Sequence, residues 1–191
     1  GKGSGFFRSD DKKAPHNLYT NTSDIWTIGA GRGGTPPPQF SYSTDPSSSS
    51  GVDVVGVKLR MDGSMKASWE WDANKRAFAR RHDDKLHLDS NGEQVTTENL
   101  LILTVEYKIS AANKKSPEAQ TTGTGVAWVL QQGKITQGTW TRADKMDPWT
   151  LTDETGEPIL LTPGRTFVEL IRKGQGVVVP AGESLSATAW P

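Results

Sequence analysis

The amino-acid sequence predicts a mainly β protein: an antiparallel, sandwich-like sheet domain built of hairpins, with a short helical segment near the N-terminus. From Val52 onward the chain consists of short runs rich in Val, Ile, Thr and Trp, separated by turn residues. Helical periodicity after residue 51 is weak. Residues 110–125 hold too few apolar side chains for an amphipathic helix, so we expect an exposed loop there with at most one turn.

Three stretches of different composition indicate the domain organisation. Residues 1–28 are mixed and are interpreted as the tail of a preceding N-terminal domain, with Ser23 or Asp24 as the cap of a short helix that ends at Gly29. Residues 29–51 are dominated by Gly, Pro and Ser, which predicts a linker or long loop because little apolar area can be buried. Residues 52–191 form the predicted β-rich C-terminal domain.

The sequence predicts three strands in the first half of that domain. Residues 52–60 form the first strand. A hairpin follows in which Trp69 and Trp71 share one face, and the turn 72–75 leads back through the strand 77–80.

The second half begins with a central strand at 100–109. This strand is buried on both faces at first and then alternates, with Val105, Tyr107 and Ile109 pointing inward. Residues 125–142 predict a hairpin that turns at Gln132-Gly133-Lys134.

The last strands follow a turn at 162–165. We expect a strand at 166–172 and another that begins near Val177, where Pro180 favours a position at a sheet edge because proline cannot donate to the ladder.

Charge and composition exclude several classes of function. Lys plus Arg equals Asp plus Glu at 22 each, so no net field attracts the chain to nucleic acid. The chain has no cysteine, which removes disulfides, thiolate metal sites and cysteine nucleophiles. The opening residues, GKGSGFFRSDDKK, lack the apolar core of a signal peptide, and we expect the natural chain to begin earlier.

The stretch RRHDDKLHLD, residues 80–89, is the strongest candidate site. A reversal at Asp83-Asp84-Lys85 would place His82 and His87 on adjacent arms, and Asp89 would share a face with His87, which suits a metal pair or an Asp-oriented base. Alternatively, the same residues have no binding role and form an ordinary hairpin, with Leu86 and Leu88 inward and His87 facing water. We favour the hairpin over a polar ligand site, and a ligand site over metal binding or catalysis.

Other motifs have simpler explanations. GAGRGG, residues 29–34, matches the dinucleotide-binding glycine pattern, but the three prolines that follow forbid the helix that this mechanism needs. In APHNLYTNT, residues 14–22, the side chains of His16, Asn17 and Tyr19 either hold a polar ligand or, as we favour, pin a loop.

The tryptophans are expected to fall into two groups. Four of them lie within predicted strands and are expected in the core: Trp69, Trp71, Trp128 and Trp140. Trp149 and Trp190 are better candidates for a ligand-binding surface.

With these stretches in view, the chain resembles the YerB-like family of bacterial cell-envelope lipoproteins, whose function is not established. The resemblance covers most of residues 6–172 and lies in FFRSDDKKAPHNLYTNT, in WEWDANKRAFARR followed by HLDSNGEQVTTENLLIL, and in the run from TGTGVAWVL to GRTFVELI. It implies a signal with a lipid-attachment cysteine and most of a first domain upstream of this chain, and hence an extracytoplasmic, membrane-anchored location.

The resemblance also singles out residues, without assigning a chemical role to any of them. They are Arg8, His16, Asn17, Tyr19, Arg80, His87, Asp89, Thr139, Trp140, Asp147, Thr166 and Glu169. The Gly/Pro/Ser loop and residues 173–191 depart from the family pattern.

Two functional hypotheses follow. The first is a non-catalytic binding or scaffolding domain whose ligand is a wall polymer or a protein, with no catalytic residue, metal, cofactor or nucleic-acid partner, and with the membrane reached only through an anchor outside this chain. Its expected ligand-binding residues are Arg8, His16, Asn17, Tyr19, Arg80, His87, Asp89, Trp140 and Asp147. The second is an envelope-acting hydrolase with His16 or His87 as general base, oriented by Asp89 or Asp147.

Overall fold

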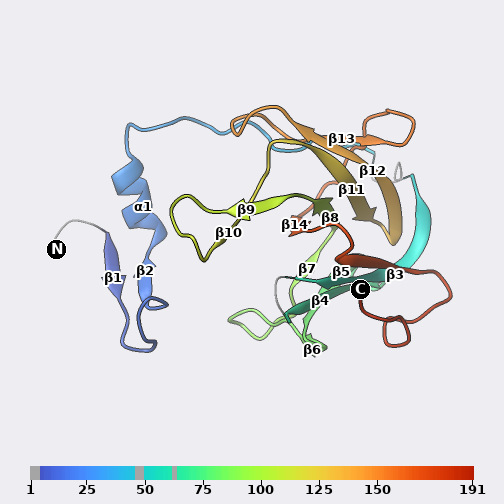
Figure 1. Ribbon diagram of the computed structural model, residues 1–191, viewed down its shortest axis with the longest axis horizontal. Helices are drawn as coiled ribbons and strands as arrows, with labels where there is room; N and C mark the ends of the chain where they lie inside the picture. The colour runs from blue at the N-terminus through green and yellow to red at the C-terminus, as the bar shows by residue number, and fades with distance from the viewer. Residues whose placement is uncertain (1–4, 46–49, 62–63) are drawn as a thin grey trace. The chain divides into compact units, whose positions relative to one another are not determined.

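The computed structural model describes residues 5–45, 50–61 and 64–191 (Figure 1). The chain divides into two compact units, Gly1–Pro37 and Pro38–Pro191. Strands dominate the described residues, which contain one short helix, so the mainly β fold class is confirmed. Within the same residues, no helix combines the length and apolar character needed to cross a membrane.

The first unit consists of a hairpin and the helix. Its elements are β1 (Phe6–Arg8), β2 (Leu18–Thr20) and α1 (Thr22–Gly29). The helix begins after Asn21, whose backbone is extended and whose side chain accepts a hydrogen bond from the Asp24 backbone N–H at 3.2 Å. The expected helix is present, but its cap is Asn21 rather than Ser23 or Asp24, because those two residues already lie within the first turn.

The second unit is built almost entirely of strands. In chain order these are β3 (Val52–Arg60), β4 (Lys66–Asp72), β5 (Ala77–His82), β6 (Lys85–Leu86), β7 (Thr96–Thr97), β8 (Asn99–Thr104), β9 (Tyr107–Ile109), β10 (Pro117–Ala119), β11 (Gly123–Gln131), β12 (Lys134–Arg142), β13 (Thr150–Asp153), β14 (Thr166–Ile171) and β15 (Gly176–Pro180). The β4–β5 and β11–β12 hairpins form where the turn residues predict them.

One large mixed sheet contains all of these strands except β9 and β10. Its order is β14-β8-β11-β12-β3-β4-β5-β6, with β13 paired to β12, β15 to β3 and β7 to β5. Among the described strands, only β8 and β14 pair in parallel. β12 and β3 share just two register pairs, Lys134 with Asp53 and Ile135 with Val52, so the sheet divides there into two halves.

The two halves pack against each other around a common core. One cluster joins β3, β4 and β5 to β8, β11 and β14, and includes Val57, Leu59, Trp69, Phe78, Leu100, Ile102, Leu130 and Ile171. A second cluster lies against the other face of β8 and β11, and includes Leu101, Leu103, Val129, Trp140 and Leu161. β8 is therefore buried on both faces, which agrees with its continuous apolar run.

The strand-borne tryptophans contribute to this core. Trp69 and Trp140 are 0% and 2% exposed, while Trp71 and Trp128 pack against the first cluster and are partly buried. Trp149 is also partly buried, since it packs edge-on against Trp140 with ring centroids 5.1 Å apart.

The stretch after β8 differs from the sequence prediction. The expected strand 100–109 ends at Thr104, and Ile109 is 72% exposed rather than inward. β9 instead pairs with β10 inside the stretch 110–125, which we expected to be a loop. Backbone hydrogen bonds close this hairpin, such as Ser110 N–H to the Ser116 carbonyl at 2.9 Å, and such bonds leave no periodic apolar signal in the sequence.

Candidate functional site

The segment RRHDDKLHLD folds as the β5–β6 hairpin. Asp83 and Asp84 both have positive φ, 47° and 63°, which is the geometry of a tight two-residue turn and is tolerated by aspartate. The expected inward packing of Leu86 and Leu88 is wrong, since they are 50% and 48% exposed. His87 is partly buried instead, because its backbone pairs with β5 and its ring contacts Arg80.

A buried network of charged and polar groups joins this hairpin to β14. The Arg80 Nε donates to Glu169 Oε1 at 3.1 Å, and the Trp69 indole N–H donates to the same oxygen at 3.0 Å. Arg80 and Glu169 are only 8% and 5% exposed. The ion pair therefore lies inside the core, where its geometry must compensate for lost hydration.

His87 extends this network at its edge. Its Nδ1 lies 2.8 Å from Arg80 Nη1, and because a guanidinium can only donate, Nδ1 accepts and the imidazole is neutral. Burial, and after it the positive charge of Arg80, lowers the pKa of His87 below its usual value of 6.5. Near neutral pH His87 is thus an uncharged acceptor for the arginine.

The second histidine of the hairpin stays near the first without forming a ligand set. The rings of His82 and His87 lie on adjacent arms, as expected, with centroids 6.4 Å apart. His82 Nε2 is 3.5 Å from an Asp83 carboxylate oxygen. Within residues 5–45, 50–61 and 64–191, no three His, Asp or Glu side chains are placed to hold a metal ion.

The two aspartates that the sequence offers as orienting groups are used in turns. Asp89 Oδ1 accepts from the backbone N–H groups of Asn91 and Glu93, at 2.8 and 3.0 Å. Asp147 Oδ2 accepts from the Asp144 N–H at 2.9 Å. Trp140 belongs to the core, and its indole N–H donates to the Thr104 carbonyl at 2.9 Å.

The remaining candidate residues lie in the first unit. Arg8 Nη1 donates to Asn17 Oδ1 at 2.6 Å, and Asn17 Nδ2 donates to the Ser9 carbonyl at 3.0 Å, so these side chains hold the loop between β1 and β2. The Tyr19 ring stacks on the Phe7 ring, with ring centroids 6.1 Å apart. His16 lies in the same loop, where its backbone N–H donates to the Lys13 carbonyl.

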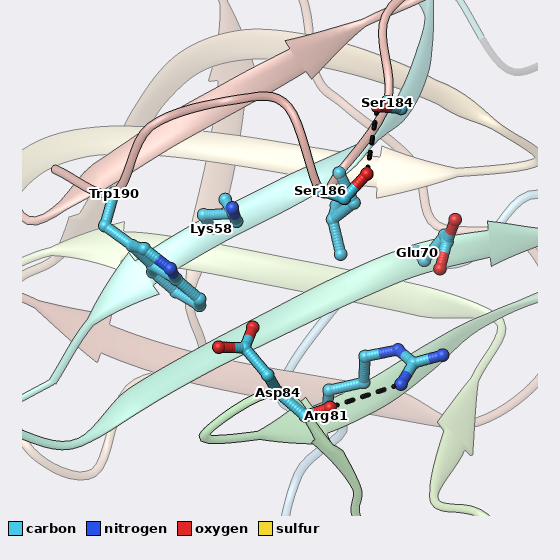
Figure 2. Close-up of a pocket in the computed structure, with 8 residues that line it drawn as sticks. Lys58, Glu70, Arg81, Asp84, Ser184, Ser186 and Trp190 are labelled. Atoms are coloured by element: carbon cyan, nitrogen blue, oxygen red, sulfur yellow. Dashed lines mark hydrogen bonds between the residues drawn. The ribbon is translucent and has the colours of Figure 1, made fainter.

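A polar groove lies on the face of β3, β4 and β5 that points away from the core. The cavity has a volume of about 440 Å³. Figure 2 shows its lining side chains, which come from the strands, from the β5–β6 turn and from the C-terminal segment. The labelled ones are Lys58, Glu70, Arg81, Asp84, Ser184, Ser186 and Trp190, and the buried Leu185 also lines the cavity. We call this feature the outer groove.

The C-terminal segment forms one wall of the outer groove and is held by cations of the sheet. Lys58 Nζ donates to the Thr188 carbonyl at 2.6 Å and lies 4.5 Å from the centre of the Trp190 ring. Lys66 approaches the same ring at 5.1 Å. Lys58 is consequently only 4% exposed although it points away from the core, and Trp190 is held in place beside the cavity.

Two carboxylates of the outer groove have no partner among the described residues, and Arg81 has only a weak one. The carboxylates of Glu70 and Asp84 form no hydrogen bond or ion pair with any described residue, while Arg81 donates only a long bond, 3.4 Å, to the Asp84 carbonyl. Figure 2 marks this bond and the contact at 3.2 Å between the Ser184 and Ser186 hydroxyls. Such unpaired groups are available to a polar ligand.

Ser68 adds a buried polar atom to this side of the sheet. On β4 it shares a face with Glu70, and its neighbours across the strands are Lys58 and Arg81, all three of which line the groove. Its hydroxyl is buried and has no hydrogen-bond partner among the described residues. Buried hydroxyls are normally paired, so Ser68 is an exception on the strand face that carries Lys58 and Glu70.

The sequence indicated only part of the outer groove. Trp190 was expected at the surface. The alternation of Trp69 and Trp71 with Ser68 and Glu70 along β4 would also have placed Ser68 and Glu70 on the opposite face. The contribution of Ser184 and Ser186 has no local signal, because it depends on the C-terminal segment returning across the sheet.

Comparison with known proteins agrees with this fold and gives no activity. Residues 57–168, more than half of the chain, match the family described as "Protein of unknown function (DUF3048) C-terminal domain". No curated protein gives a significant match.

The solved structures add a similar fold. The crystal structure of the YerB protein from Bacillus subtilis has a TM-score of 0.72 and 18% sequence identity to this chain, and the alignment covers 92% of this chain and 60% of YerB. The resemblance seen in the sequence is thus confirmed. The chain belongs to the DUF3048 family, and its fold is the YerB-like fold of proteins whose function is unknown.

Proposed function

We propose that this chain is a non-catalytic binding domain of a bacterial cell-envelope protein, located outside the cytoplasmic membrane, and that it binds a sugar-containing wall polymer in the outer groove. The observation that carries the proposal is the combination in one cavity of a fixed tryptophan, two unpaired carboxylates and two serine hydroxyls.

The chemistry of these groups suits a carbohydrate with charged substituents. A pyranose ring offers an apolar C–H face to an indole such as Trp190, and its hydroxyls donate to carboxylates such as Glu70 and Asp84. Arg81 can pair with a carboxylate of an attached peptide or uronic acid. The volume of about 440 Å³ lies in the range of small-ligand sites, which matches one or two sugar units of a longer chain.

The hydrolase alternative has no such combination in its favour. His87 turns Nδ1 towards Arg80, so neither Asp89 nor Asp147 orients it, and both carboxylates already cap turns. The described residues therefore supply a binding surface more readily than a paired base and orienting acid.

Sedimentation with purified peptidoglycan tests the proposal. We expect the chain to co-sediment, and Trp190→Ala to weaken the apparent affinity by about tenfold or more, as expected for loss of a central aromatic contact. Glu70→Gln, which keeps the shape of the side chain but removes its charge, should also weaken retention.

The matched control is Trp26→Ala, which removes a tryptophan that is 78% exposed and lies outside the groove. Trp26→Ala should bind as the unmodified chain does. Absence of co-sedimentation, or equal losses for Trp190→Ala and Trp26→Ala, would remove the glycan proposal and favour a protein partner.

A further inference from the structure

A second and larger cavity lies where β8 ends, beside β9, β11 and the loop between β14 and β15. Its volume is about 770 Å³, and it shares no residue with the outer groove. Its lining includes the apolar or aromatic Tyr107, Val126 and Trp128 and the charged Glu106, Arg172 and Lys173, together with two threonines. Val126 is 50% exposed, so the apolar wall is accessible to solvent.

A smaller cavity of about 230 Å³ adjoins it and makes the cationic character stronger. Tyr107 and Arg172 line both cavities. The smaller cavity adds the lysines of the β9–β10 hairpin, which are Lys108, Lys114 and Lys115. We call the two together the β9 cleft. It has an apolar end at Trp128 and a cationic end at the hairpin.

Positive charge is concentrated here although the whole chain is neutral. Among the described residues that line the two cavities, Glu106 is the only carboxylate, against five Lys and Arg side chains. Glu118 lies opposite Lys108 in the hairpin, but no ion pair joins them. The Arg172 guanidinium contacts the Tyr107 ring at 4.3 Å, and no described residue accepts a hydrogen bond from it. Its donors are therefore available to an anion.

Hydrogen bonds fix the walls of the β9 cleft in advance. The Tyr107 hydroxyl donates to the Leu170 carbonyl at 3.0 Å. The loop that carries Arg172 is closed by the Gln175 side chain, which accepts from the Arg172 N–H at 2.9 Å, and by the Gln175 N–H, which donates to the Arg172 carbonyl at 3.1 Å. Such preorganisation lowers the entropy cost of binding.

Close packing fixes the apolar end as well. A Cβ at Gly176 would lie 2.9 Å from Trp128 Cζ3, so the indole rests directly against the backbone of β15. The ring is thereby held at the cavity, where one side of the Trp128 side chain packs on the core cluster and another lines the β9 cleft.

From this geometry we infer that the β9 cleft binds a phosphate ester with an apolar tail. The tail packs on Val126 and Trp128, and the phosphate oxygens accept hydrogen bonds from Arg172 and pair with Lys173 and the hairpin lysines. Neither part alone fills the cleft, because an inorganic anion leaves the apolar wall exposed and a neutral amphiphile leaves the arginine donors unpaired.

Isothermal titration with n-octyl phosphate below its micelle concentration tests this inference, using the whole chain. We expect saturable binding at a one-to-one ratio. Inorganic phosphate and n-octyl glucoside, which each carry one half of the required chemistry, should bind at least about tenfold more weakly.

Three surface variants localise the binding. Arg172→Gln removes the central donor and should lower the affinity for octyl phosphate by about tenfold, and Lys173→Glu should lower this affinity by about fivefold. Val126→Glu places a carboxylate on the apolar wall and should abolish binding. The matched control is Lys85→Glu, an exposed charge reversal on β6 outside the cleft, which should leave the affinity unchanged.

Vesicles distinguish the two sources of such a phosphate. Co-flotation with phosphatidylglycerol vesicles, lost in Val126→Glu and retained in Lys85→Glu, assigns the phosphate to a membrane lipid. Octyl phosphate binding without flotation assigns it to a soluble phosphate ester. The inference is overturned if octyl phosphate does not bind, if inorganic phosphate binds equally well, or if Lys85→Glu and Lys173→Glu have equal effects.

Discussion

At the scale of single residues, some charged side chains are paired inside the core and others lie at cavities without a hydrogen-bond partner among the described residues. Arg80 and Glu169 satisfy each other inside the core, together with Trp69 and His87. Arg172, which is half-buried at a cavity, has donors that no described residue accepts. A buried ion pair is weak evidence for function because it can exist for packing alone, whereas unpaired groups at a cavity support the proposal of a ligand there.

The buried pair gives a prediction at this scale. Glu169→Ala leaves the Arg80 charge and the Trp69 indole N–H unpaired in the core, which should lower the free energy of unfolding by about 3 kcal/mol. Glu169→Gln keeps an acceptor for both donors and should lower the free energy of unfolding by less than Glu169→Ala does. Chemical denaturation followed by tryptophan fluorescence measures both. A loss no greater than that of the exposed change Glu118→Ala would contradict the assigned role.

At the scale of elements, close backbone approach decides which residues the strands tolerate. Gly56 on β3 lies opposite Glu70, and a Cβ built there would be 1.9 Å from the Trp69 carbonyl oxygen. Gly138 on β12 meets the Thr152 carbonyl oxygen at the same distance. Both glycines allow neighbouring strands to approach where any side chain would separate them.

Gly56→Ala should therefore destabilise the second unit by about 3 kcal/mol, because β3 and β4 must move apart to admit one methyl group. The comparison is Gly34→Ala, where a Cβ meets no atom within 4 Å and φ is not in the left-handed region. Thermal unfolding should show a lower midpoint for the first variant alone. Equal midpoints would mean that the sheet adapts at little cost.

At the scale of the whole molecule, the second unit contains its own core. Both hydrophobic clusters consist of residues from Phe40 onward. The stretch just after Pro37 belongs with this unit: Tyr42 bridges to Leu161, and its hydroxyl lies 3.0 Å from the Thr166 hydroxyl. Part of the Gly/Pro/Ser-rich stretch thus packs on the sheet.

Removal of residues 1–37 should consequently leave the unfolding midpoint of the second unit nearly unchanged, because its free energy of unfolding should change by no more than about 0.5 kcal/mol. Removal of residues 1–45 also deletes Phe40 and Tyr42 and should lower the midpoint measurably, because their contacts to the second cluster and to Thr166 are lost. Calorimetry of the two shortened chains checks this. Equal midpoints would show that the stretch 38–45 contributes nothing to stability.

Local pattern predicted most elements of the second unit correctly. The alternation in β4, the turn residues 72–75 and the continuous apolar run of β8 each depend on neighbours in sequence, so the sequence indicates them directly. The same reasoning failed at Leu86 and Leu88. The orientation of these side chains follows from backbone pairing, of Leu86 with β5 and of Leu88 with Gln94, rather than from hydrophobicity.

The candidate site residues were predictable only in part for the same reason. The sequence singles out Arg80, His87 and Glu169 separately, but it does not show that Arg80 contacts the other two. The contact with Glu169 requires β4 and β5 to pack against β14, and the two residues are 89 positions apart in the chain. The outer groove requires the C-terminal segment to return across β3, and the β9 cleft requires a hairpin that apolar periodicity does not reveal.

By itself, the sequence determined the mainly β class, most strand positions and the burial of Trp69 and Trp140, because these follow from side-chain alternation over a few residues. Only the tertiary structure decided which charges pair in the core and which remain available at cavities. That outcome depends on contacts between segments far apart in the chain, where burial rather than local pattern determines whether a polar group finds a partner.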